Sequence, residues 1–301
     1  MNKITEIPII GRVHSCYNEK WGTPRQGKYG SSSLATIELN SRIFNKGELE
    51  ALEEYSHIML IFIFNFNKIK NSRQKNFLCA TNTDKYFVHY NAKVTPPKID
   101  NGEKRGCLAT RSPHRPVPIG LTICNIVHID LFGMKIQVNG VDIIDGTPII
   151  EILPYSLYCS ISKEIIRAPN WVKPEKVFGI MNLCIYFSFA SFLDILNISN
   201  MKKEKSNVHF FEDGNSYKNF NKLHNFIVEI LKIDPRSRYS KKKAKLTLFG
   251  IKLFNNFQLI YHHHEMYIKV IRFLHTSNLL VKGLNPRTID WYNRLKDFIC
   301  L

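Results

Sequence analysis

The feature that most constrains the fold is a series of short strand-like segments, separated by Gly and Pro turns, over the first 155 residues. Residues 7–13 form a short apolar run, residues 34–39 alternate, and residues 58–64 are apolar almost throughout, as in a strand buried on both faces. Most apolar residues of 121–131 share one parity, and residues 135–139 alternate. Short strands with such turns predict a barrel or a sandwich.

Two exceptions interrupt this strand-rich half of the sequence. Residues 48–55 predict its one helix, which is short. Residues 67–92 are poor in pattern and rich in Asn and Lys, so we interpret them as a low-complexity loop insertion.

The second half of the chain has a mixed pattern. Apolar residues recur at helical spacing over 223–231, and this helix must end near Asp234-Pro235, because a residue before proline disfavours the helical region. Three strand-like segments follow, at 246–254, 256–261 and 267–273. We therefore predict a mainly β chain, with a small β-barrel domain at 1–160 and a small α+β domain at 161–301.

An apolar, aromatic segment at 177–196 is the one candidate for a membrane span. Asn182 and Asp194 interrupt it, and it falls short of the 18 or more clean apolar residues that a span needs. We interpret it as a buried core element, with Phe187, Phe189 and Phe192 in the core, and predict no membrane association.

The charge of the chain points to a polyanionic partner. The 42 Lys and Arg residues exceed the 25 Asp and Glu residues and give a net charge of +17. Such a surplus is typical of proteins that bind nucleic acid or an acidic membrane surface. The alternative is coding bias, since Lys, Asn and Ile are all plentiful here.

The cysteines and histidines predict no metal site. The seven cysteines form no CxxC pair, and no Cys or Asp near His262-His263-His264 completes a ligand set. Nothing resembles a secretion signal, so we expect reduced thiols and a cytoplasmic location.

Three blocks are candidates for chemistry, at 22–27, 109–120 and 142–148. In the second block, prolines stiffen a loop that carries Arg111 and Arg115, and a rigid guanidinium suits carboxylate or phosphate recognition. The alternative is a rigid surface turn with solvated arginines. In the third block, Asp145 and Gly146 form a turn whose carboxylate can accept hydrogen bonds from a ribose or an amine, although Asp-Gly is also a common turn.

The order of these blocks along the chain resembles the TrmO (TsaA-like) tRNA methyltransferase family. The resemblance covers residues 4–158 and, more loosely, 220–273. It is carried by Ile10-Gly11-Arg12-Val13, Pro24-Arg25-Gln26, Glu54-Tyr55-Ser56-His57-Ile58, Val94-Thr95-Pro96-Pro97-Lys98, the blocks at 109–120 and 142–148, Ile152-Leu153-Pro154-Tyr155 and Asp234-Pro235-Arg236-Ser237-Arg238-Tyr239.

The resemblance implies a small β-barrel that binds S-adenosylmethionine (SAM) and forms a homodimer. It also implies a C-terminal domain that grips the tRNA anticodon stem-loop. The implied reaction is N6-methylation of N6-threonylcarbamoyladenosine on the 3′ side of the anticodon. No GxGxxG follows a strand here, which agrees with a fold other than the Rossmann type.

The family's cofactor-contacting positions carry over to Pro24, Arg25, Gln26, Asn65, Phe66, Arg111, Leu121, Ile144, Asp145, Gly146 and Thr147. Two positions depart from the family pattern. Asn65-Phe66 stand where bacterial members often have His-Gln, and Ser237 replaces a proline of the C-terminal signature.

Further roles are hypotheses from the chemistry that the resemblance implies. Asp145 orients the cofactor or accepts the proton, or else only caps its turn. Arg111 and Arg115 are candidates to bind the threonyl carboxylate. The phosphate-contact candidates, which are otherwise a solvated charge run, are Arg236, Arg238, Lys241, Lys242 and Lys243. The alternative functions are a non-catalytic RNA-binding barrel and a methyltransferase with another acceptor.

Overall fold

The computed structural model describes most of the chain. It describes residues 7–20, 22–27, 30–66, 76–80, 85–88, 92–96, 102–115, 117–160, 166, 169, 171, 183–201, 216–236, 248–254 and 256–276.

The chain divides into two compact units. The first comprises residues 1–14, 35–141 and 146–179, and the second comprises residues 15–34, 142–145 and 180–301. Two short pieces from the first half of the sequence therefore belong to the second unit. The predicted domain boundary near residue 160 stays a prediction.

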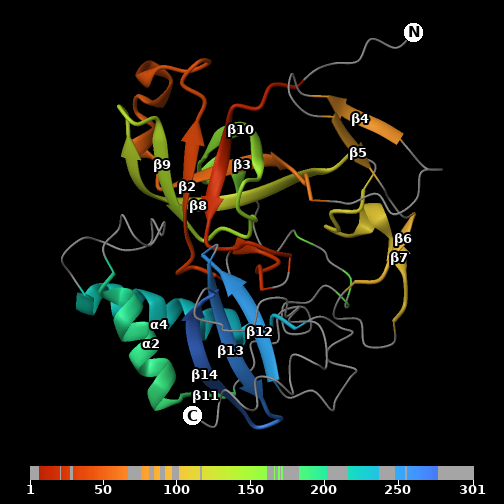
Figure 1. The fold of residues 1–301 in the computed structure, drawn as a ribbon. Coiled ribbons are helices and arrows are strands. Elements are labelled where there is room, and N and C mark those ends of the chain that lie inside the picture. Colours follow the sequence, from red (N-terminus) through yellow and green to blue (C-terminus); the bar gives the residue numbers. More distant parts are fainter. Residues whose placement is uncertain are drawn as a thin grey trace. The chain divides into compact units, whose positions relative to one another are not determined.

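The first unit is built on a closed six-stranded barrel, which confirms the prediction of a mainly β fold with a barrel (Figure 1). The strand pairs β1–β10, β10–β3, β3–β8 and β8–β9 are antiparallel. Buried side chains such as Val13, Ile37, Leu60 and Ile136 fill the interior of the barrel. In spatial order the strands are β1 (Gly11–Ser15), β10 (Pro148–Tyr155), β3 (His57–Ile63), β8 (Ile119–Asp130), β9 (Lys135–Asn139) and β2 (Leu34–Leu39).

Strand β8 turns its larger apolar residues outward. Leu121, Ile123 and Val127 are exposed, whereas Thr122 and Cys124 are buried. The cause is the neighbouring strand β3, whose inward residues Ile58, Leu60 and Phe62 pair with Cys124, Thr122 and Gly120. A Cβ at Gly120 would clash with the Phe62 ring. Large side chains on one strand thus leave room only for small ones on the next.

The helix predicted at 48–55 is wrong in type and extent. Two 3-10 turns, η2 (Lys46–Leu49) and η3 (Leu52–Glu54), occupy this segment. Ala51, with φ of 63°, separates them, and a left-handed residue cannot continue an α-helix. Asn45 and Glu48 form a capping box that starts the first turn.

The segment interpreted as a loop insertion at 67–92 contains a hairpin, so that interpretation is wrong for its described part. Strands β4 (Asn76–Ala80) and β5 (Lys85–Val88) pair antiparallel, with a shift in register. Their aromatic and branched residues favour strands, but the surrounding Asn and Lys hide that pattern. A second small sheet pairs β6 (Lys93–Val94) with β7 (Arg105–Gly106). Two further 3-10 turns are η4 (Cys107–Ala109), which follows β7, and η5 (Leu157–Cys159), which follows β10.

The second unit is an α+β layer structure. Its four-stranded sheet has the order β11 (Cys184–Phe187), β14 (Tyr267–His275), β13 (Phe257–His263) and β12 (Leu248–Leu253), with β11 parallel to β14 and the other pairs antiparallel. Helices α2 (Phe189–Ser199) and α4 (Ser216–Lys232) lie on the same side of this sheet (Figure 1). The predicted helix before Asp234 and the three predicted strands are confirmed.

The prediction of a buried core element at 177–196 is wrong for its described part. Phe189 keeps 79% of its surface exposed and Phe192 keeps 45%, and only Ser191, Ile195, Ile198 and Ser199 of α2 are buried. Asp194 of α2 forms a bidentate ion pair with Arg272 of β14, and this contact orients the helix on the sheet. Within the described ranges, no helix combines the length and the apolar character that a bilayer crossing requires.

Candidate functional site

The loop with Pro24, Arg25 and Gln26 belongs to the second unit. Pro24 is buried, Gln26 is half-buried and Arg25 is exposed by area. Packing nevertheless desolvates the Arg25 guanidinium and lowers its pKa, and the charge of Asp234 partly offsets this effect. The loop begins at Gly22, whose φ of +88° favours glycine.

Asn65 and Phe66 lie in the turn that follows β3. The Oδ1 atom of Asn65 is buried and has no hydrogen-bond partner among the described residues. A buried carbonyl oxygen without a donor is costly, so this atom is a candidate acceptor for a ligand. Phe66 is 42% exposed.

The proline-rich block at 109–120 is held next to the same turn. The Phe64 amide donates a 2.7 Å hydrogen bond to the Pro118 carbonyl. Within the block, Arg111 Nη2 donates to the Leu121 carbonyl at 2.9 Å, which joins two of the predicted cofactor residues. Arg115 Nη1 donates to the Thr110 carbonyl at 2.8 Å and is half-buried. Both arginines therefore brace the loop through main-chain contacts.

The turn at 144–147 is fixed by hydrogen bonds on both sides of Gly146. Asp145 Oδ1 accepts a 3.0 Å hydrogen bond from the Ser15 amide, and the Asp145 amide donates to the Tyr17 carbonyl at 2.7 Å. The Gly146 amide donates to the Val13 carbonyl at 2.8 Å, and the buried Thr147 continues into β10. The Asp145 carboxylate thus ties this turn to Ser15 at the end of β1.

The predicted RNA-contacting residues are only partly described. Arg236 forms a bidentate ion pair with Asp234, at 2.7 and 3.0 Å, and its guanidinium lies 5.4 Å from the centre of the Phe249 ring. Arg238, Lys241, Lys242 and Lys243 lie outside the described residues. Within the part of the chain that the structure describes, no three His, Cys, Asp or Glu side chains gather as metal ligands.

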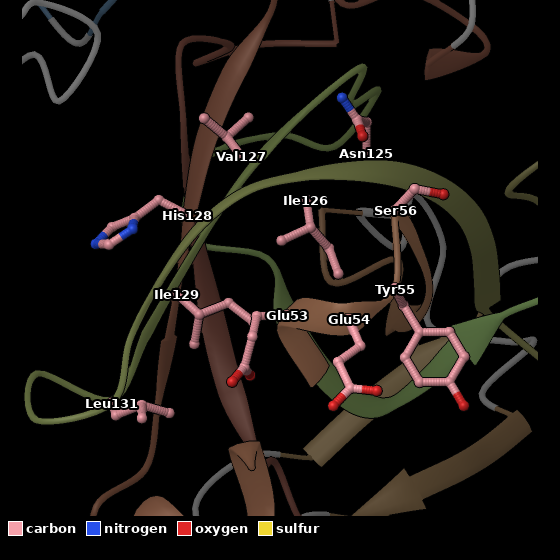
Figure 2. A pocket seen from close by; sticks show the side chains of 10 residues that line it. All are labelled: Glu53, Glu54, Tyr55, Ser56, Asn125, Ile126, Val127, His128, Ile129 and Leu131. Atoms are coloured by element: carbon pink, nitrogen blue, oxygen red, sulfur yellow. The ribbon is translucent and has the colours of Figure 1, made fainter. Parts of the chain in front are cut away.

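A groove of about 580 Å³ opens on the first unit (Figure 2). It is lined by residues 53–56 and by residues 125–129 and 131. The His128 ring points away from the carboxylates of Glu53 and Glu54, so they form no acid–base pair (Figure 2). None of the predicted site residues lines this groove.

Sequence reasoning missed Glu229, Ser31 and Ser32, which meet beside the predicted cofactor loop. Glu229 accepts hydrogen bonds from the Ser32 amide and from both serine hydroxyls. These partners are 197 or 198 residues apart in sequence, and no periodicity or spacing signals such a contact.

Comparisons with known proteins identify residues 12–160, which include the barrel. Residues 12–160 match the family model of the tRNA-methyltransferase O N-terminal domain. A mouse protein named tRNA (adenine(37)-N6)-methyltransferase is 40% identical over 156 residues, which cover 51% of this chain and 31% of the mouse protein. A Pyrococcus abyssi protein named as a probable S-adenosyl-L-methionine-binding protein is 32% identical, over 48% of this chain and 65% of that protein.

Solved structures extend the likeness in fold beyond the first unit. The crystal structure of TrmO from Pseudomonas aeruginosa superposes with a TM-score of 0.61 at 19% identity, covering 91% of this chain and 100% of that one. The chain spans about a third of the mouse relative, and the shared sequence is the barrel region. Residues 12–160 form a tRNA-methyltransferase O N-terminal domain, and the chain belongs to the TrmO family.

Proposed function

We propose that this chain is a SAM-dependent tRNA methyltransferase that methylates N6 of the adenosine at position 37, on the 3′ side of the anticodon. The name of the mouse relative supports tRNA as the substrate and adenine N6 as the methylated atom, and the name of the archaeal relative supports SAM as the methyl donor. The observation that carries the proposal in the structure is the orphaned Oδ1 of Asn65, beside a braced arginine loop.

The described residues fit the cofactor. SAM carries an adenine amino group and an α-ammonium group as donors, and a carboxylate as acceptor. Asn65 Oδ1 offers a buried acceptor without a partner, which suits one of those donors. A Cβ at Gly146 would meet no atom of the described residues within 4 Å, so the main chain there is open to a ligand. The residues that we propose to hold SAM are Pro24, Arg25, Gln26, Asn65, Phe66, Arg111, Leu121, Ile144, Asp145, Gly146 and Thr147.

When bound, SAM supplies a methyl group on a positively charged sulfur. The protein's part is then mainly to position donor and acceptor, because an in-line displacement depends on alignment. Hydrogen bonds hold the side chains of Arg111 and Arg115 and the turn at 144–147 in place for this task. Since the Asp145 carboxylate holds its turn to the Ser15 amide at the end of β1, we assign it an orienting role.

We further propose that the acceptor is N6-threonylcarbamoyladenosine, whose threonyl carboxylate needs a cationic partner. Arg115 is the candidate, because one guanidinium nitrogen holds Thr110 and the fork offers further donors. Arg115→Ala is expected to lower kcat/KM for the modified tRNA about 10- to 100-fold, as a charged hydrogen bond of about 1.5–3 kcal/mol is lost.

The control for this variant is SAM binding measured by calorimetry, which should be unchanged in Arg115→Ala. A loss of SAM affinity in that variant would assign Arg115 to the cofactor and contradict the substrate role. Arg115→Lys keeps the charge without the fork and should fall between the two.

We propose the tRNA anticodon stem-loop as the partner and a homodimer as the assembly. The net charge of +17 supports a polyanionic partner. Arg238, Lys241, Lys242 and Lys243 stay the proposed phosphate contacts, whereas Arg236 first has to leave Asp234 or bind in its ion-paired state. Affinity for the stem-loop should fall steeply with salt, with a slope of about −0.7 per phosphate contact.

A further inference from the structure

The predicted cofactor loop is tied at its C-terminal end to helix α4. Ser31 Oγ and Ser32 Oγ donate to Glu229 Oε1 at 3.0 and 2.7 Å, and the Ser32 amide donates to Oε2 at 2.8 Å. All donors go to one carboxylate, so the contact is charge-assisted. The helix itself is anchored, because its residues Leu223, Phe226, Ile227 and Ile230 are fully buried.

The contacts continue from these serines back to Pro24. The Ser33 amide donates to the Gly30 carbonyl and the Gly30 amide donates to the Gly27 carbonyl, both at 2.9 Å. Gly30 lies so close to the loop that a Cβ there would be 3.1 Å from Pro24 Cγ. A shift of residues 30–33 would therefore move Pro24 and its neighbours.

The N-terminal end of the loop rests on the sheet of the same unit. Gly22 packs on Ile251 of β12 so closely that a Cβ would clash with that side chain. Just before the loop, Tyr17 forms a bridge with Leu253, and its ring lies 5.9 Å from the Phe226 ring. The loop is thus held at both ends by elements from residues 180–301.

We propose that Glu229 is a positioning residue that holds the loop segments 22–27 and 30–33 in their SAM-binding conformation. Residues 180–301 of the second unit then serve cofactor binding as well as the tRNA contact that the family resemblance implies. The inference rests on the proposed function, since it takes Pro24, Arg25 and Gln26 as cofactor contacts.

The test is SAM binding and kinetics of Glu229→Gln in the full chain. Gln removes the negative charge of Glu229, so the contact with Ser31 and Ser32 is no longer charge-assisted and is weaker. The dissociation constant for SAM and the KM for SAM should rise about tenfold, with kcat at saturating SAM and the KM for tRNA unchanged. Ser32→Ala should raise the SAM constants less, and the double variant should fall short of the sum, because both changes act on one contact.

Glu265→Gln is the matched control, as Glu265 is exposed in the turn between β13 and β14 of the same unit. It should leave SAM binding unchanged. If wild-type protein binds SAM and Glu229→Gln binds it equally well, the inference is wrong while the proposed function stands. A fall in kcat with an unchanged KM for SAM would show a merely structural role and would also overturn it. Failure of the wild type to bind SAM would overturn both.

Discussion

At the scale of single residues, Asn65 has a side chain that destabilises the free protein and that we propose to bind SAM. Its side-chain oxygen is buried without a donor, which destabilises the free protein. A strained or unsatisfied group persists at a site when a ligand completes it. The family resemblance implies that bacterial members often have His at this position, and an Asn can supply an acceptor in its place.

Asn65→Ala is therefore expected to weaken SAM binding without weakening the fold. The dissociation constant measured by calorimetry should rise about tenfold, since one hydrogen bond of about 1 kcal/mol or more is lost. The melting temperature without SAM should stay the same or rise, because the orphaned oxygen is gone. Asn197→Ala, at an exposed position of α2, is the control for both readouts.

An unchanged SAM affinity in Asn65→Ala would remove Asn65 from the cofactor site. A marked drop in melting temperature would instead show that Asn65 has a structural role that the described contacts do not include.

Substitution of Gly146 and of Gly106 by Ala compares the strain that a side chain causes at a positive φ with that at a negative φ. A Cβ at either position would meet nothing within 4 Å, but Gly146 has φ of +76° and Gly106 has φ of −54°. Gly146→Ala should lower the free energy of unfolding by about 1–2 kcal/mol, the cost of a left-handed non-glycine residue. Gly106→Ala should change it little. Denaturant titration without SAM measures both, and equal effects would contradict the left-handed turn at Gly146.

At the scale of elements, α4 and α2 differ in how much of their surface they bury. Phe226 of α4 is fully buried and its ring lies 5.4 Å from the Phe254 ring, whereas Phe189 at the start of α2 is 79% exposed. The hydrophobic period of α4 is visible in the sequence because a single face is buried. Ile195 and Ile198 of α2 are buried, but its other large apolar residues, Phe189, Phe192, Leu193 and Leu196, are exposed, so apolar character alone misplaced them.

The same substitution in the two helices tests this difference. Phe226→Ala should destabilise the second unit by about 3–5 kcal/mol, the usual cost of truncating a buried Phe. Phe189→Ala should stay within about 0.5 kcal/mol of the wild type, as surface changes usually do. Urea unfolding followed by circular dichroism measures both. A large loss of stability in Phe189→Ala would place that side chain in a core or an interface.

At the scale of the whole molecule, the sequence predicts those helices and strands whose own residues show a clear hydrophobic periodicity. The barrel strands, α4 and the sheet strands after residue 248 have clear periodicity, and the family blocks identify the barrel. The 3-10 turns at 46–54 depend on the left-handed Ala51, and the inverted faces of β8 depend on the large side chains of β3. The contact of Glu229 with Ser31 and Ser32 depends on tertiary packing. A local sequence pattern predicts neither these turns, nor the side-chain directions of β8, nor the Glu229 contact.

The most direct test of the proposed function is methyl transfer from labelled SAM to two matched tRNAs. One carries the threonylcarbamoyl group on the adenosine beside the anticodon, and the other has unmodified adenosine there. The account predicts incorporation into the first tRNA alone, with the label on N6. Incorporation into neither tRNA, by protein that is folded and binds SAM, would contradict it.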